Sequence, residues 1–337
     1  MSEIVIHVTY PLGTQPGDRL ALRTDQDWFS DLLPAEVSAD RHHTTFRFVA
    51  TEPFHYFKPV LYLGGELHWA QGNNYLALGN GGSEREIYPY FFGDRQCSVC
   101  NIKELGDGDH RHEFRVFYPP GYDENYLKRY PVIYMQDGQN LFFPNEAFGG
   151  THWMIEETLG LLDQMNAIDK LIVVGVYPKN RMRDYTQPGY DAYGEFLVKE
   201  LKPYIDSNYR SLTGPENTAV MGSSLGGVVS FYLAWQYPDI FGMAACMSST
   251  FGFQDDLRAR VEAEAKRPVR FYLDSGWPHD NYEVTRDLRT LLLRRGYDDG
   301  HELTYLAFPE ALHNEKSWAM RVHIPIQLFF GRVRKSH

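Results

Sequence analysis

A serine between glycines is the clearest candidate for chemistry in this sequence. Gly222-Ser-Ser-Leu-Gly226 matches the pattern G-x-S-x-G, in which the central serine, Ser224, is a nucleophile. Short apolar residues precede the motif and a helical spacing of apolar residues follows it, so it lies between a strand and a helix. A tight turn there places the hydroxyl at the helix start, where free N–H groups favour negative charge. We therefore predict that Ser224 is a nucleophile; a glycine-rich turn without chemistry is the alternative.

A serine hydroxyl needs a base to take its proton and an acid to orient that base. In a sheet with a serine at such a strand-to-helix turn, the order along the chain is serine, acid, histidine. Of the 13 histidines, only His313 follows the predicted last strand, 303–308, and precedes the predicted last helix. His313 is therefore the predicted base, with a surface residue at a helix start as the alternative. Four other histidines are expected to be solvated: His42, His43, His110 and His112.

Two aspartates compete for the role of the acid. Asp274 ends the predicted strand 269–274, where a side chain more often braces the neighbouring loop. Asp280 lies further along that loop and has more freedom to reach His313. We favour Asp280 and keep Asp274 as the alternative, and either residue could instead be an N-cap or turn aspartate.

An oxyanion hole needs two N–H donors aimed at the oxygen that becomes negative. The first is expected from Leu225, directly after the nucleophile. The second is expected from the loop Asp137-Gly-Gln after an early apolar strand, where glycine permits close approach, and we assign it to the Gln139 N–H. A simple tight turn is the alternative for this loop.

The elements that must hold these residues divide the chain in two. Residues 1–90 show short strands with dense turn chemistry, which predicts a small all-β sandwich, and residues 84–94 are interpreted as a linker. Residues 95–337 alternate between strands and helices, which predicts a mostly parallel, doubly wound sheet. Its strands are expected near 112–118, 131–136, 171–177, 218–221, 243–248, 269–274 and 303–308, and its helices near 153–165, 196–205, 226–236, 284–295 and 318–330.

Charge and composition narrow the classes of partner. The net charge of −11 argues against nucleic acid or an anionic membrane as the main partner. The chain lacks the start of a signal peptide and any apolar run of about 20 residues, so a cytoplasmic location is expected. Cys97 and Cys100 form a single C-x-x-C pair, which is a weak indication of zinc.

Several separate motifs resemble one known family. Residues 134–142, 221–227, 272–276 and 313–318 look like the esterase D group of α/β-hydrolases, which includes enterochelin-esterase-like hydrolases and feruloyl esterases. The likeness spans residues 95–332. By position it implies an α/β-hydrolase fold with Ser224 as nucleophile and His313 as base, and it supports Asp280 and Gln139 in their roles. The sequence departs from siderophore esterases in showing no arginine-rich pocket for a triscatecholate.

A looser resemblance concerns the N-terminal part. Residues 57–61, 67–70 and 72–75 look like the end of a starch-binding or early-set carbohydrate module. The likeness implies either glycan binding through Trp69 or a packing role for this side chain, and we favour packing.

Together these features predict a serine carboxylic-ester hydrolase that forms an acyl-enzyme on a small or glycan-linked ester, with no metal or organic cofactor. Two alternatives stay open, a noncatalytic carbohydrate-binding protein on a hydrolase scaffold and an acyltransferase with the same triad. A homodimer is also left open.

Overall fold

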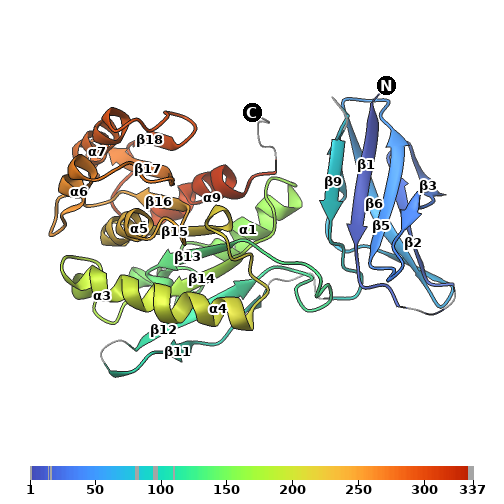
Figure 1. The fold of residues 1–337 in the computed structure, drawn as a ribbon, viewed down its shortest axis with the longest axis horizontal. Coiled ribbons are helices and arrows are strands. Elements are labelled where there is room, and N and C mark those ends of the chain that lie inside the picture. The colour runs from blue at the N-terminus through green and yellow to red at the C-terminus, as the bar shows by residue number, and fades with distance from the viewer. Residues whose placement is uncertain are drawn as a thin grey trace. The chain divides into compact units, whose positions relative to one another are not determined.

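The computed structural model describes residues 2–13, 15, 17–79, 83–93, 98–108 and 111–332, and it divides into two compact units (Figure 1). The first unit comprises Met1–Cys97 with two later segments, Pro119–Arg129 and Gln164–Asn166. The second unit comprises Ser98–Tyr118, Tyr130–Asp163 and Ala167–His337. The assignment of residues 1–90 and 95–337 to separate domains stays a prediction, and the sequence did not indicate that two later segments join the first unit.

The first unit is built from two sheets that enclose a core. One has the strand order β4 (Glu36–Val37), β5 (His43–Val49), β1 (Glu3–Thr9), β9 (Ser83–Ile87). The other has the order β3 (Asp27–Leu32), β2 (Arg19–Thr24), β6 (Phe54–Leu63), β7 (Glu66–Trp69), with β8 (Tyr75–Leu78) also paired to β6. Alternate side chains of β1 are fully buried, among them Ile4, Ile6 and Val8, as the period of two in a strand requires. The predicted all-β sandwich is thereby confirmed.

The linker prediction for residues 84–94 is wrong where the structure describes it. Ser83–Ile87 forms β9, which pairs in parallel with β1. Tyr90 and Phe91 are buried. Glu84, Arg85 and Glu86 are three consecutive charged residues on an edge strand, and the sequence alone did not distinguish such a run from a linker. Asp94 lies outside the described residues.

A carboxylate explains why the segment Pro119–Arg129 belongs to the first unit. Glu124 accepts backbone N–H groups of Phe91 at 2.6 Å and Phe92 at 2.8 Å, and the Tyr10 hydroxyl at 3.1 Å. Asn125 donates to the Thr9 carbonyl at 2.9 Å. These bonds attach the segment to the end of β1 and to the chain after β9.

In the part of the chain that the structure describes, the second unit contains a mixed sheet of nine strands. The strand order is β10 (Ser98–Val99), β12 (His112–Tyr118), β14 (Ile172–Val176), β13 (Val132–Gln136), β15 (Thr218–Ser223), β16 (Met243–Met247), β17 (Arg270–Trp277), β18 (Leu303–Pro309), and β11 (Lys103–Leu105) pairs with β12. The sheet is parallel from β14 to β18, whereas β10, β11 and β12 pair antiparallel. The predicted mostly parallel sheet is thus confirmed.

Helices cover this sheet, with α3, α4 and α5 on one side and α1 and α9 on the other (Figure 1). The helices are α1 (Ile155–Gln164), α2 (Arg181–Asp184), α3 (Gly189–Phe196), α4 (Lys202–Asn208), α5 (Leu225–Gln236), α6 (Leu257–Ala263), α7 (Tyr282–Arg294), α8 (Glu315–Arg321) and α9 (His323–Phe330). A π-helical turn, Leu197–Leu201, joins α3 to α4. Eleven of the twelve residues of α5 are buried, so this helix forms part of the core beneath the nucleophile motif.

Two elements near the site differ from their predicted bounds. β17 continues past Asp274 to Trp277, because Ser275, Gly276 and Trp277 keep pairing with the end of β18. The sequence analysis predicted that the strand ends at Asp274 and that a loop follows. The predicted closing helix is two helices, α8 and α9, that meet at Val322.

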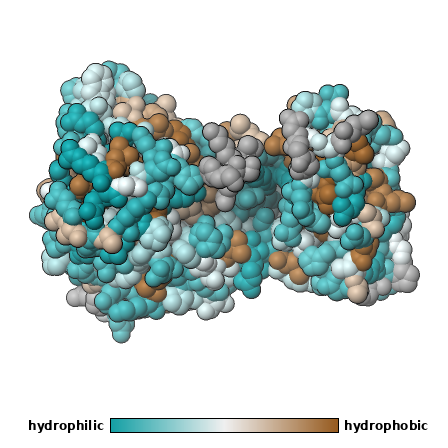
Figure 2. Space-filling model, turned by 45° about the horizontal axis from the view of Figure 1, so that its top comes forward, coloured by the Kyte–Doolittle hydropathy of each residue, from teal (hydrophilic) through white to brown (hydrophobic). Residues whose placement is uncertain are grey.

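Trp69 lies at the end of β7 and is 37% exposed, with the Arg23 guanidinium 5.0 Å from its ring centroid. On the face drawn in Figure 2, hydrophobic residues of the first unit form small separate groups among polar ones. The two roles considered for Trp69, packing and glycan binding, stay predictions.

Within the described part of the chain, no helix combines the length and the apolar character needed to cross a membrane.

Candidate active site

Ser224 lies at a sharp corner between β15 and α5. Its backbone has φ 56° and ψ −123°, a conformation that L side chains rarely adopt. Gly222 and Gly226 make the corner fit, because a Cβ on Gly222 would lie 2.5 Å from the backbone of Gly226. The corner turns the Ser224 side chain out at the N-terminal end of α5.

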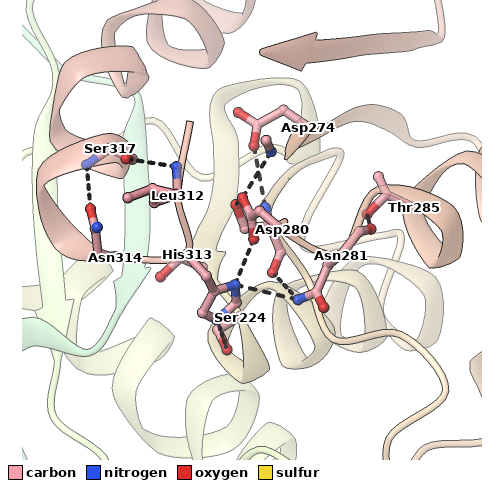
Figure 3. A network of polar contacts seen from close by, with 12 residues as sticks. Ser224, Asp274, Asp280, Asn281, Thr285, Leu312, His313, Asn314 and Ser317 are labelled. Atoms are coloured by element: carbon pink, nitrogen blue, oxygen red, sulfur yellow. Dashed lines mark hydrogen bonds and ion pairs between the residues drawn. The ribbon is translucent and has the colours of Figure 1, made fainter. Parts of the chain in front are cut away.

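His313 lies in the loop between β18 and α8, and the start of α8 fixes that loop. The Asn314 side chain accepts the Ser317 N–H at 2.9 Å as an N-cap, and Ser317 Oγ accepts the Leu312 N–H at 3.1 Å. The imidazole packs edge-on against Trp318, with ring centroids 5.0 Å apart. His313 Nε2 lies 2.9 Å from Ser224 Oγ (Figure 3).

Asp280 reaches the other side of the same imidazole. Its Oδ1 lies 2.6 Å from His313 Nδ1, and its side chain is fully buried. Its Oδ2 accepts the Gly276 N–H at 2.8 Å and the Ser248 hydroxyl. Burial raises the pKa of Asp280, but hydrogen bonds from His313, Ser248 and Gly276 outweigh it, and the net pKa is below the ordinary value.

Asp274, the alternative acid, has other partners. Arg321 donates to both of its oxygens, at 3.0 and 3.1 Å, and the Tyr272 hydroxyl donates at 2.7 Å. Its complete burial raises the pKa of Asp274, which Arg321 and the hydrogen bonds oppose. In Figure 3 the Asp280 carboxyl lies toward His313, and Asp274 lies on the far side of it.

The hydrogen-bond chain fixes where the protons lie. An ionised Asp280 can only accept, so Nδ1 of His313 carries the proton and Nε2 is left as an acceptor. Nε2 then faces the Ser224 hydroxyl, which can donate to it. This arrangement is able to withdraw the Ser224 proton while Asp280 stabilises the imidazolium that results.

The two predicted oxyanion donors, Leu225 and Gln139, lie in the first turn of α5 and in a 3-10 turn after β13. Leu225 is the first residue of α5, so its N–H has no acceptor within the helix. Gln139 lies in the 3-10 turn Gly138–Asn140, and this turn follows Asp137, whose φ is 55°. A Cβ on Gly138 would lie 2.5 Å from the backbone of Gly175, so only glycine allows this close approach to β14.

A cavity of about 370 Å³ opens in front of Ser224 and His313. Its other lining residues are Asp137, Gln139, Asn140, Phe148, Arg181, Asn314, Glu315 and Trp318. Arg181 pairs with Asp137 through Nε at 2.9 Å, which offsets the charge of this carboxylate beside the turn that contains Gln139. The side chains of Phe148 and Trp318 form an apolar part of the cavity wall.

Among the residues of this region that sequence reasoning did not single out, three lie close to the proposed triad. Glu315 lines the cavity, and Ser248 and Arg321 lie behind Asp280. Ser248 follows β16 without any motif, and Glu315 and Arg321 look like ordinary charges in the first and last turns of a helix. No signal in the sequence distinguishes them, because their roles depend on contacts with distant strands.

Two further expectations concern histidines and metals. His112 was expected to be solvated, which is wrong: it is 3% exposed and packs 4.5 Å from the Phe196 ring. His110 and Cys97 lie outside the described residues. Cys100 is a free thiol, and the described residues contain no group of three or more His, Cys, Asp or Glu that could hold a metal ion.

Comparison with known proteins places this geometry in context. Residues 108–319 match the model of the family described as "Putative esterase". The protein YbbA of Bacillus subtilis is 26% identical over 169 residues, which cover 46% of this chain and 62% of YbbA. The chain thus spans less than two thirds of the length of this relative.

Solved structures share the fold. A ferulic acid esterase superposes with a TM-score of 0.60 at 17% identity, covering 70% of this chain and 99% of that one. The enterobactin esterase FES from Shigella flexneri has a TM-score of 0.54 at 11% identity, and this match covers 97% of this chain and 92% of that one. At these identities the likeness concerns the fold alone.

Proposed function

This chain belongs to the esterase family whose model matches residues 108–319, and we propose that it is a serine carboxylic-ester hydrolase working through an acyl-enzyme. One observation carries the proposal: the path from Ser224 Oγ to His313 Nε2 and from His313 Nδ1 to Asp280 spans 2.9 and 2.6 Å at the edge of a cavity. These are hydrogen-bond distances for a nucleophile, its base and the group that orients the base.

The proposed reaction follows from this geometry. Ser224 Oγ attacks the ester carbonyl while His313 Nε2 takes its proton, and the N–H groups of Leu225 and Gln139 stabilise the tetrahedral oxyanion. His313 then returns the proton to the leaving alcohol, and the acyl group stays on Ser224. Water then attacks the acyl carbonyl while His313 takes its proton, and His313 returns that proton to Ser224 Oγ as the bond to the acyl group breaks and the acid leaves. Asp280 holds His313 in the required tautomer throughout.

The proposed substrate is a small or glycan-linked ester. A cavity of about 370 Å³ falls in the range of small-molecule sites, and Phe148 and Trp318 offer apolar contact to an acyl group. The names of the ferulic acid esterase and the enterobactin esterase suggest ester classes to screen. A cytoplasmic location and a homodimer stay predictions.

Ser224→Ala tests the proposal. We expect hydrolysis of p-nitrophenyl acetate and butyrate to fall by about 10³-fold or more, because the residual rate depends on binding and the oxyanion donors alone. Ser223→Ala is the matched control, since it removes the neighbouring hydroxyl of the same motif and should retain turnover. Near-wild-type turnover by a folded Ser224→Ala protein would refute the mechanism. A wild-type protein inactive on p-nitrophenyl, feruloyl and siderophore esters would refute the activity.

A further inference from the structure

The buried side of Asp280 holds an arrangement that neither the motifs nor the family model assigns. We propose that Arg321 and Ser248 are positioning residues for Asp280: Arg321 fixes the Ser248 hydroxyl so that its single proton points to the Asp280 carboxylate. This inference rests on the proposed function, because it assigns Asp280 the role of the acid that orients His313.

Arg321 is the last residue of α8 and is 3% exposed. Its Nε and Nη2 donate to the two oxygens of Asp274 at 3.1 and 3.0 Å, and Nη2 also donates to Ser248 Oγ at 2.5 Å. The guanidinium lies 5.2 Å from the centre of the Phe308 ring. A buried guanidinium with these contacts is held in one orientation, and it presents a donor to Ser248.

Ser248 converts that fixed donor into a directed hydrogen bond. It follows β16 with φ 43°, is fully buried, and is anchored by its own N–H, which donates to the Asp274 carbonyl at 2.8 Å. A serine hydroxyl has one proton, and a guanidinium cannot accept. Because Ser248 Oγ accepts from Arg321, its proton is free to donate to Asp280 Oδ2, the contact that the structure shows.

The two oxygens of Asp280 are thereby divided. Oδ2 receives Ser248 and the Gly276 N–H, with Arg321 Nη2 3.6 Å away, and Oδ1 is left to His313. Donors and a nearby positive charge favour the ionised carboxylate. Held in this way, the Asp280 carboxylate accepts the Nδ1–H of His313 through Oδ1. This bond keeps the His313 imidazole in the tautomer and orientation that a base for Ser224 requires.

Several charged groups face the pair formed by Asp280 and His313. Asp274 of β17 and Arg321 of α8 lie behind Asp280, whereas Glu315 of α8 lies on the pocket side and interacts electrostatically with His313. The amide of Asn281 lies 3.5 Å from His313 Nδ1. Removing the Ser248 hydroxyl changes none of these charges, so its effect on titration reports on the hydrogen bond itself.

Ser248→Ala is the first test. Without this donor Asp280 becomes more basic, and the protonated form of His313 is stabilised. We expect the His313 pKa, followed by NMR titration of its imidazole, to rise by about half a unit to one unit. The acid limb of the kcat/KM profile on a p-nitrophenyl ester should move to higher pH by the same amount, with a fall in the plateau of about tenfold.

Arg321→Lys tests whether the arginine acts through the serine. Lysine keeps the charge but lacks the fork that reaches both Asp274 oxygens and Ser248 at once. If Arg321 acts through Ser248, the double variant Arg321→Lys/Ser248→Ala should lower kcat/KM no further than the more severe single variant. If the two single-variant losses in kcat/KM instead multiply in the double variant, the proposed coupling between Arg321 and Ser248 is wrong.

Tyr272→Phe is the matched control, because it removes a hydrogen bond to Asp274 from the same buried cluster and leaves the hydrogen bonds of Asp280 to Ser248, Gly276 and His313 intact. It should lower the melting temperature without moving the His313 pKa. The inference is overturned if Ser248→Ala also lowers only the melting temperature. The NMR titration needs no substrate, so this outcome is distinct from failure of the proposed function, which is loss of ester turnover in the wild-type protein.

Discussion

The surroundings of Asp280 and of Glu315 can be compared directly, because both carboxyls interact with His313, although Asp280 is fully buried and Glu315 is only partly buried. Burial raises the pKa of Glu315 to about 7, the charge of Asp137 adds to this, and the Trp153 N–H opposes it. Asp280 experiences burial as well, yet its pKa lies below the ordinary value. Burial by itself therefore does not decide which carboxyl is charged.

The difference lies in the partners. Glu315 accepts two neutral donors, Asn140 Nδ2 at 2.9 Å and Trp153 Nε1 at 3.2 Å. Asp280 accepts three donors, and one of them, His313, becomes a cation when it takes a proton. The region behind His313 is thus arranged to keep a charge. The region in front of it holds a carboxyl that is half protonated near neutral pH and joins α8 to the turn that contains Gln139.

The largest expected effect comes from breaking the charged side. Asp280→Asn keeps the shape of the side chain but can place an amide N–H against His313 Nδ1, which favours the wrong tautomer. We expect kcat/KM to fall by about 10⁴-fold with a small change in melting temperature, as judged by ester hydrolysis and thermal unfolding. A fall of less than tenfold would mean that Asp280 does not orient the base.

A middle-sized effect is expected from the second buried aspartate. Asp274→Asn leaves the His313–Asp280 bond in place but removes the charge that faces Arg321. The free energy of unfolding should fall by about 2–3 kcal/mol, since a buried guanidinium loses its main partner. Denaturant unfolding measures this loss, and kcat/KM should stay within about tenfold of wild type. If Asp274→Asn instead abolished turnover and spared stability, Asp274 would be the acid.

The smallest effect concerns the pH dependence of stability. The pKa of Glu315 is raised in the folded state, so the protonated carboxyl stabilises the fold. This contribution to the free energy of unfolding is fully present below the unfolded pKa of about 4.5 and is lost as pH rises through about 7. Glutamine does not titrate, so the Glu315→Gln variant does not show this pH-dependent loss of stability. Between pH 4.5 and 8 the variant should therefore lose about 1–2 kcal/mol less than wild type, a modest amount because solvent screens a partly exposed group.

Unfolding at both pH values measures that difference. Glu283→Gln is the control, since Glu283 occupies the first turn of α7 and is exposed. It should leave the pH dependence as in wild type. Parallel curves for wild type and Glu315→Gln would show that Glu315 is not buried enough to shift its titration.

Local patterns in the sequence were sufficient for much of the second unit. The G-x-S-x-G motif is read within a few residues, and the alternation of strands and helices reports which faces are buried, so the parallel sheet and the corner at Ser224 could be predicted. His313 could be selected because the order of elements leaves one histidine after the last strand. The structure brings Ser224, His313 and Asp280 to hydrogen-bond distance, and their catalytic roles stay the proposal made above.

Tertiary structure decided what depends on contacts between distant segments. β17 extends to Trp277 because β18 lies beside it, and a Cβ on Gly276 would lie 2.0 Å from the Ala311 carbonyl oxygen, so the loop that carries Asp280 folds tightly against the loop before His313. Residues 83–87 form the strand β9 because they pair with the edge of β1. Arg321, an ordinary charged residue in the sequence, contacts Asp274 of β17, Ser248 directly after β16, and Asp280 in the loop after β17. Residue types and spacing along a chain specify local conformation and burial, whereas the charge state of a buried carboxyl depends on donors that only the folded chain brings together.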